Sequence, residues 1–162
     1  MRRLTLVRHA RAVAARDSVI DFDRVLSPEG ITEAKEMAQR VASRTPRPDL
    51  VLSSSAARAS HTAALFAQAW EDDPPRIELQ SRLYLATPDI LLDVIHALAD
   101  GDVVIVGHNP GISELARRVA LQPIGDLATA AVLQLEFDAP DWVVIGSDEP
   151  VRMQLESPPG SG

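Results

Sequence analysis

Arginine and histidine side chains follow three short apolar segments of this 162-residue chain. The residues that share this placement are Arg8 and His9 after residues 4–7, Arg58 after residues 50–52, and His108 after residues 103–106. Guanidinium groups present planar, paired N–H donors that suit the oxygen atoms of phosphate and carboxylate groups. No Asp or Glu lies in the stretches 8–11, 53–62 and 107–111 that carry these side chains. The sequence therefore predicts a cationic site that binds an anionic group.

The three apolar segments have the composition of strands that are buried on both faces of a parallel sheet. Segments with a helical period separate them, and the clearest begins with Ser27 as N-cap and Pro28 in the first turn. Alternating strands and helices predict an α/β fold, a three-layer α/β/α sandwich with a mostly parallel central sheet. Because ligands bind beyond the carboxyl ends of parallel strands, we expect all of the polar side chains above at one edge of the sheet.

The last forty or so residues change character, because residues 130–137 and 142–145 have the composition of strands separated by a short turn. A further short strand is expected at 151–155. These segments predict an antiparallel C-terminal edge on the parallel sheet. We expect residues 1–156 to form a single domain and the tail 157–162, rich in Ser, Pro and Gly, to be disordered.

Composition excludes several classes of protein. The chain has no Cys, which excludes disulfide scaffolds, Cys-ligated zinc and a thiolate nucleophile. A formal net charge of −7 argues against nucleic acid as a partner. No apolar run approaches the roughly 20 residues that span a bilayer, so no membrane partner is expected. The first apolar run is too short for a secretory signal, and we expect a cytoplasmic protein.

Three sequence blocks, in this order, resemble the signatures of the histidine phosphatase superfamily, also called the phosphoglycerate-mutase-like group. They are residues 6–10 with Arg8-His9, residues 53–63 with Arg58, and residues 104–110 with Gly107-His108. The stretches 21–30 and 82–86 are most similar to the SixA-type phosphohistidine phosphatase branch. The resemblance extends from residue 2 to about residue 137.

This resemblance implies a metal-independent phosphatase without a cofactor, which uses His9 as the nucleophile and forms a covalent phosphohistidine. It places Arg8, Arg58 and His108 around the phosphoryl group. Arg24 resembles an arginine of the SixA-type branch and is expected to reach the phosphate or the rest of the substrate, and Asn109 is also expected to bind substrate. His61 and His96 lie inside predicted helices, where we expect them to be structural or exposed.

The resemblance also implies the substrate, which is phosphohistidine in a phosphorylated protein, with inorganic phosphate as product. Relatives that cleave sugar or glycerol phosphates have a Glu or Asp that protonates the departing alkoxide, whereas residues 80–84 contain no acid here. An imidazole leaving group can carry its own proton before the N–P bond breaks. Asp21 and Asp23 are the alternative proton donors.

Three other functions stay open at this point. The first is a phosphomonoesterase that acts on a small phospho-metabolite, such as a sugar or nucleotide phosphate. The second is a non-catalytic module that binds a phosphoryl group. The third is a hydrolase with a metal held by His9, His108, Asp21 and Asp23, although the charges of Arg8 and Arg58 would repel a divalent cation.

Overall fold

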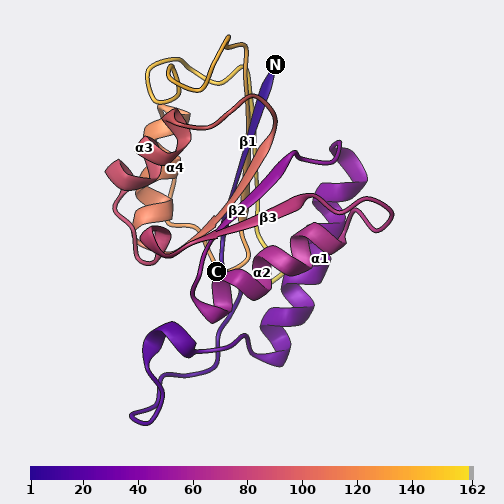
Figure 1. Cartoon of the computed structure of the whole chain (residues 1–162), viewed down its shortest axis with the longest axis vertical. Coiled ribbons are helices and arrows are strands. Elements are labelled where there is room, and N and C mark those ends of the chain that lie inside the picture. Colours follow the sequence, from indigo (N-terminus) through magenta and orange to yellow (C-terminus); the bar gives the residue numbers. More distant parts are fainter. Residues whose placement is uncertain (161–162) are drawn as a thin grey trace.

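The apolar runs and the amphipathic segments between them build a six-stranded mixed sheet with helices on both faces (Figure 1). The structure is a computed structural model and describes residues 1–160. Its strands are β1 (Arg2–Arg8), β2 (Leu50–Ser54), β3 (Arg76–Gln80), β4 (Val103–Gly107), β5 (Val132–Phe137) and β6 (Arg152–Glu156). Their spatial order is β3-β2-β4-β1-β5-β6. The first four strands in this order are parallel, and β5 and β6 are antiparallel, as predicted.

Four α-helices connect the strands and form the outer layers. They are α1 (Pro28–Arg44), α2 (Ala57–Gln68), α3 (Pro88–His96) and α4 (Gly111–Ala120). Two 3₁₀ turns, η1 (Asp21–Asp23) and η2 (Ser81–Leu83), come before α1 and α3 respectively. Helices α1 and α2 cover one face of the sheet, whereas α3 and α4 cover the other (Figure 1). Ser27 caps α1 as expected, because its Oγ accepts a hydrogen bond from the Gly30 N–H at 3.0 Å. The predicted three-layer sandwich is confirmed.

Successive side chains of the central strands point to opposite faces of the sheet, so each strand contributes to both apolar cores. Leu4 and Leu6 of β1 pack into the apolar cluster beneath α3 and α4, whereas Val7 packs into the cluster beneath α1 and α2. All three side chains are completely buried. Since β1 lies between β4 and β5, it is held from both sides, and its carboxyl end has a well-defined position.

Two glycines let the chain approach itself closely near that end of the sheet. A Cβ at Gly30 would lie 2.0 Å from the Arg11 carbonyl oxygen, and one at Gly111 would lie 1.9 Å from the Ala86 carbonyl oxygen. Any side chain at these positions would therefore displace a loop. The start of α1 thus packs directly on the loop after β1, and the start of α4 packs on the segment after η2.

The prediction of a strand at 142–145 is wrong. These residues form turns in a loop between β5 and β6, and the indole N–H of Trp142 donates to the Ala99 carbonyl at 2.9 Å. His96 contacts the Ile145 carbonyl through Nε2 at 2.9 Å, and both Trp142 and Ile145 are 1% exposed. The apolar character of this segment therefore reflects two buried side chains, Trp142 and Ile145, that attach the loop to the core beneath α3. It does not reflect pairing with a neighbouring strand. The strand predicted at 151–155 is present as β6.

Of the tail 157–162, the structure describes residues 157–160, in which Pro158 is buried, and residues 161–162 lie outside the described part. The disorder of this tail and the domain boundary at residue 156 stay predictions. No helix within residues 1–160 combines the length and the apolar character needed to cross a membrane.

Candidate active site

The carboxyl ends of three neighbouring strands bring the predicted cationic and imidazole side chains together. His9 follows β1, His108 follows β4, and Arg58 lies in the first turn of α2, just after β2. The rings of His9 and His108 are 5.1 Å apart between centroids. Nε of Arg58 lies 3.4 Å from Nε2 of His9. All three residues are less than 10% exposed, so the group is an enclosed cluster rather than a set of solvated strand ends.

His9 is held in one tautomer. Its Nδ1 lies 2.7 Å from the carbonyl oxygen of Ala10, and because a carbonyl only accepts, Nδ1 carries the proton. Nε2 therefore presents its lone pair towards Arg58. Burial lowers the pKa of His9 to about 4, the Ala10 hydrogen bond opposes this shift, and the charges of Arg58 and Arg8 add to it. The ring is thus neutral at neutral pH.

Thr62 fixes the loop that carries His9 against α2. Its Oγ accepts the Ala10 N–H at 3.0 Å and donates to the Arg58 carbonyl at 2.8 Å. One buried hydroxyl therefore sets the spacing between His9 and Arg58. Sequence reasoning assigned no role to Thr62, although it lies in the same short block as Arg58.

His108 is also neutral. Burial first, and then the neighbouring His9 and Arg58, lower the pKa of His108 to about 3. Its Nε2 lies 2.8 Å from Ser54 Oγ, which accepts the Ala56 N–H. This arrangement allows the Ser54 hydroxyl to donate to Nε2, in which case Nδ1 of His108 carries the ring proton.

Two buried nitrogen atoms beside His9 have no hydrogen-bond partner within residues 1–160: Nδ1 of His108 and Nε of Arg8. Elsewhere in its guanidinium, Arg8 donates from Nη1 to the Leu127 carbonyl at 2.9 Å. Burial lowers the pKa of Arg8 from its ordinary value. Because buried donors are nearly always paired in native proteins, these two fit a site whose ligand supplies acceptor oxygens.

A carboxylate also enters the cluster, which corrects the expectation that nothing neutralises its arginines. Asp21 of η1 accepts from Nη2 of Arg58 at 3.0 Å, from Nη1 of Arg24 at 2.9 Å and from the hydroxyl of Tyr84 at 2.5 Å. The Tyr84 hydrogen bond first, and then Arg24, hold the pKa of Asp21 far below its usual range. This side chain lies outside the three polar stretches of the sequence and reaches the cluster through the fold alone.

Tyr84 is a site residue that sequence reasoning missed. Its ring lies edge-on to His108 with centroids 5.4 Å apart, and Phe22 packs edge-on against it at 5.0 Å. The Arg58 guanidinium carbon lies 5.9 Å from the Tyr84 ring centroid. The hydrogen bond to Asp21 raises the pKa of the Tyr84 hydroxyl. A signal was available, since Tyr84 is the only Tyr in the chain and follows the carboxyl end of β3, where the same strand-end rule applies.

Arg24 contacts the cluster through Asp21. Its Nε and Nη2 donate to the Val13 carbonyl at 3.1 and 2.9 Å, which closes the loop between β1 and α1. Asp23, on the same 3₁₀ turn, is exposed, and its side chain forms no ion pair within the described residues. The substrate contact expected of Arg24 stays a prediction.

Asn109 supports the loop that contacts Arg8. Its Nδ2 donates to the Leu127 carbonyl at 3.1 Å, and its Oδ1 accepts from the hydroxyl of Ser113. Ser113 Oγ in turn accepts the Leu127 N–H at 2.9 Å. The Asn109 side chain thus stabilises the position of Leu127, directly and through Ser113. Its predicted contact with substrate stays a prediction.

The remaining histidines lie away from this cluster. His61 is exposed on α2, and His96 holds the loop after β5, in agreement with the expectation for both. Within residues 1–160, no group of three or more His, Asp or Glu side chains is arranged to hold a metal ion. The hypothesis of a metal held by His9, His108, Asp21 and Asp23 gains no support from this arrangement.

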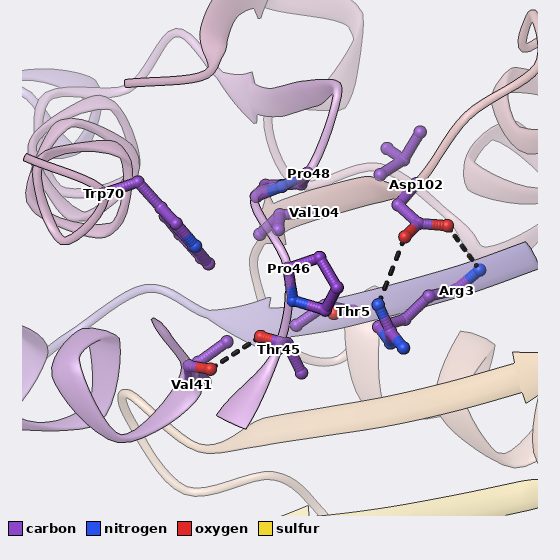
Figure 2. A pocket seen from close by; sticks show the side chains of 10 residues that line it. Arg3, Thr5, Val41, Thr45, Pro46, Pro48, Trp70, Asp102 and Val104 are labelled. Carbon is purple, nitrogen blue, oxygen red and sulfur yellow. Dashed lines mark hydrogen bonds and ion pairs between the residues drawn. The ribbon is translucent and has the colours of Figure 1, made fainter. Parts of the chain in front are cut away.

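A separate hollow lies at the opposite ends of the strands, between the start of β1, the end of α1 and Trp70 (Figure 2). Arg3 and Asp102 line it, and they bond to each other through both the Arg3 N–H at 3.0 Å and Nη1 at 3.2 Å. Arg3 and Asp102 satisfy one another here, whereas the buried indole Nε1 of Trp70, which also lines the hollow, has no hydrogen-bond partner within residues 1–160.

The fold and the His–Arg cluster at the ends of β1, β2 and β4 are those of a phosphoglycerate-mutase-like α/β protein. Residues 4–84 match the model of the histidine phosphatase superfamily (branch 1), and the chain belongs to this superfamily. Its relatives place it with the SixA-type branch. Phosphatase is therefore the class of activity to which the chain belongs.

Three relatives illustrate the range of the match. A candidate phosphohistidine phosphatase SixA from Agrobacterium tumefaciens is 33% identical, with 82% of this chain and 90% of that chain covered and a TM-score of 0.74. An uncharacterized protein from Mycobacterium tuberculosis is 35% identical over 133 residues, which cover 81% of this chain and 80% of the relative. A mycobacterial glucosyl-3-phosphoglycerate phosphatase is 20% identical, covers 100% of both chains with a TM-score of 0.67, and is a likeness of fold alone.

Proposed function

We propose that this protein is a metal-independent phosphatase that removes the phosphoryl group from phosphohistidine in proteins, through a covalent phosphohistidine on His9. One observation carries the proposal: a neutral His9, with its proton held on Nδ1 by Ala10, turns the Nε2 lone pair towards the Arg58 guanidinium. A nucleophile and a cationic donor thus lie next to each other, as phosphoryl transfer requires.

In the first step, the Nε2 lone pair of His9 attacks phosphorus in line with the leaving group. The N–P bond of the substrate breaks, and its electron pair returns to the substrate imidazole, which already carries a proton on its other nitrogen. Arg8, Arg58 and Nδ1–H of His108 donate to the three equatorial oxygens, where charge accumulates in the transition state. The buried unpaired nitrogens of Arg8 and His108 support this assignment.

In the second step, water attacks the phosphorus of phosphorylated His9. The P–Nε2 bond breaks, its electron pair returns to Nε2, and inorganic phosphate leaves while the proton of the water passes to solvent. Because Nδ1 keeps its proton on the Ala10 carbonyl, the phosphorylated ring is cationic and its nitrogen is a good leaving group. The free enzyme is thereby restored in the tautomer with which it began.

The charge states around the site favour an imidazole as the leaving group of the first step. Asp21 is ionised, and the pKa of Tyr84 is raised by the hydrogen bond to Asp21, so neither has a proton to give readily at neutral pH. A departing alkoxide would therefore leave without a general acid, which typically contributes 10²–10⁴-fold in rate. An imidazole that carries its own proton does not need one.

The phosphomonoesterase alternative is supported only by the fold that the chain shares with the glucosyl-3-phosphoglycerate phosphatase. A module that only binds phosphoryl groups would need the cations, but it would not need a neutral histidine whose free nitrogen faces them. The tautomer of His9 therefore argues against a module that only binds, whereas a phosphomonoesterase would use the same tautomer and differs only in its leaving group.

The test compares phosphate release from a phosphohistidine-bearing protein, phosphoimidazole, a phosphoserine peptide and glucose 6-phosphate. We expect the two N–P substrates to be preferred, and an acid-labile phosphoenzyme to form in the wild type and be lost in His9→Ala. His61→Ala, which removes an exposed histidine from α2, is the matched control and should retain activity. Preference for the esters would refute the substrate, and full activity of His9→Ala would refute the mechanism.

A further inference from the structure

Asp21 lies on the side of Arg58 that is turned away from His9. Nε of Arg58 faces Nε2 of His9 at 3.4 Å, whereas Nη1 and Nη2 bind the backbone and carboxylate oxygens of Asp21 at 2.8 and 3.0 Å. The Asp21 side chain is 44% exposed, whereas that of Arg58 is 5% exposed. A carboxylate thus stands at the solvent side of the cluster, just outside the place where a phosphoryl group would meet His9.

The carboxylate of Asp21 also pairs with Arg24, the second arginine of this region. Arg24 donates from Nη1 to Asp21 at 2.9 Å, and its Nε and Nη2 donate to the Val13 carbonyl. An anionic group attached to the substrate beyond its phosphoryl group would therefore meet two arginines that already share one carboxylate. It would also meet the negative charge of Asp21 itself.

We propose that Asp21 determines the specificity of this site: it rejects phosphoryl compounds that carry a second anionic group on the leaving group and favours a neutral or cationic one. The proposal rests on the proposed function, because it concerns what leaves when His9 takes the phosphoryl group. A protonated imidazole meets a carboxylate of opposite charge at the mouth of the site, and a carboxylate-bearing ester meets a like charge.

Tyr84 keeps this charge in place. Its hydroxyl donates to the carboxylate of Asp21 at 2.5 Å, and its ring lies edge-on to His108 with centroids 5.4 Å apart. The negative charge is therefore fixed relative to the phosphoryl-binding side chains and does not move freely with the exposed loop. A fixed charge discriminates between leaving groups, whereas a mobile one would turn away from a repulsive substrate.

The test uses two esters that differ only in one group of the leaving group, which is a neutral hydroxymethyl in glycerol 3-phosphate and a carboxylate in 3-phosphoglycerate. Their dissociation constants are measured by calorimetry in a His9→Gln background, which prevents turnover, with and without Asp21→Asn. Asn retains an oxygen acceptor for Arg58, and the backbone bond from Nη1 is untouched, so Arg58 stays oriented. Asp23→Asn, on the same 3₁₀ turn, removes an equal charge whose side chain forms no ion pair with either arginine in the described structure, and it is the matched control.

We expect the background protein to bind glycerol 3-phosphate about tenfold more tightly than 3-phosphoglycerate, as one like-charge contact near a protein surface would produce. Asp21→Asn should abolish this preference, and Asp23→Asn should preserve it. In otherwise wild-type enzyme, Asp21→Asn should also lower kcat/KM for phosphoimidazole.

Equal affinities for the two esters in the background protein would overturn the proposal, as would a preference that survives Asp21→Asn. These results are independent of turnover. A wild type that binds with the expected preference but does not hydrolyse phosphoimidazole would instead refute the proposed function.

Discussion

Replacing Arg58 by Ala tests how much the cationic side chain beside His9 contributes to the reaction. The substitution removes the Nε–H that faces His9 Nε2 at 3.4 Å and the two bonds to Asp21. In the proposed transition state it removes a charged donor to a phosphoryl oxygen. Removal of a comparable preorganised donor from an oxyanion site costs about 2.7–4 kcal/mol, so we expect kcat/KM to fall by about 10²–10³-fold.

The cost to folding should be much smaller. The ion pair with Asp21 is partly exposed, and such pairs are worth at most about 1 kcal/mol. Loss of the buried stem of Arg58 adds a packing term, and removal of a buried charge offsets part of it. We expect the free energy of unfolding to fall by about 1–2 kcal/mol in total, so that the variant remains folded at ordinary temperature.

The assay measures phosphate release from phosphoimidazole, alongside urea unfolding of the same preparations. Arg58→Lys keeps the charge but not the paired donors, and we expect it to lie between the wild type and Arg58→Ala. Arg40→Ala is the control, because Arg40 forms an exposed pair with Glu36 on the surface of α1. Activity of Arg58→Ala within about threefold of the wild type, in a folded variant, would refute the assignment of Arg58 to the transition state.

Acidification should destabilise the fold: His9 and His108 stay neutral when folded, with pKa values of about 4 and about 3, but titrate near 6.5 when unfolded. The unfolded chain therefore binds more protons, and the free energy of unfolding should fall by up to about 1.4 kcal/mol per pH unit for each ring as pH drops below 6.5. Urea titrations at several pH values measure this slope, and a slope that His9→Gln and His108→Gln leave unchanged would contradict the reasoning. Thr62→Val should cost about 1–3 kcal/mol of stability and lower activity, because it leaves the buried Ala10 N–H unpaired, whereas the exposed Thr32→Val should do neither. Excess EDTA should leave phosphate release unchanged, and a loss restored by a divalent cation would show that the reaction needs a metal.

The positions of His9 and His108 were predictable because each directly follows an apolar run of a buried strand. Parallel strands must be apolar on both faces, so the first polar residues mark their ends, and the right-handed crossover brings those ends to one edge. Arg58 could be added because it begins the helix after β2. The tautomer of His9 was also foreseeable, since a histidine that attacks through one nitrogen needs an acceptor for the other, and Ala10 supplies it.

Asp21 was harder to assign because it follows no strand end closely, whereas Tyr84 was missed although it follows the carboxyl end of β3. Asp21 reaches Arg58 since the chain after β1 folds back on itself, with Ala12 paired to Leu26 and Arg24 bound to the Val13 carbonyl. Such contacts have no periodic signal. The strand expected at 142–145 failed for a related reason, because two buried side chains in a turn-rich loop have the same composition as a short strand.

By itself, the sequence predicted the alternation of strands and helices up to β5, the edge of the sheet where the proposed active site lies, and the identities of the histidine and arginine side chains there. These follow from local patterns, because burial on both faces dictates an apolar strand and its end dictates the first polar residue. The tertiary structure alone decided the charges at that edge. Burial keeps His9 and His108 neutral, and a carboxylate from a distant turn neutralises Arg58, since desolvation and Coulomb energy depend on which groups the folded chain brings within a few ångströms.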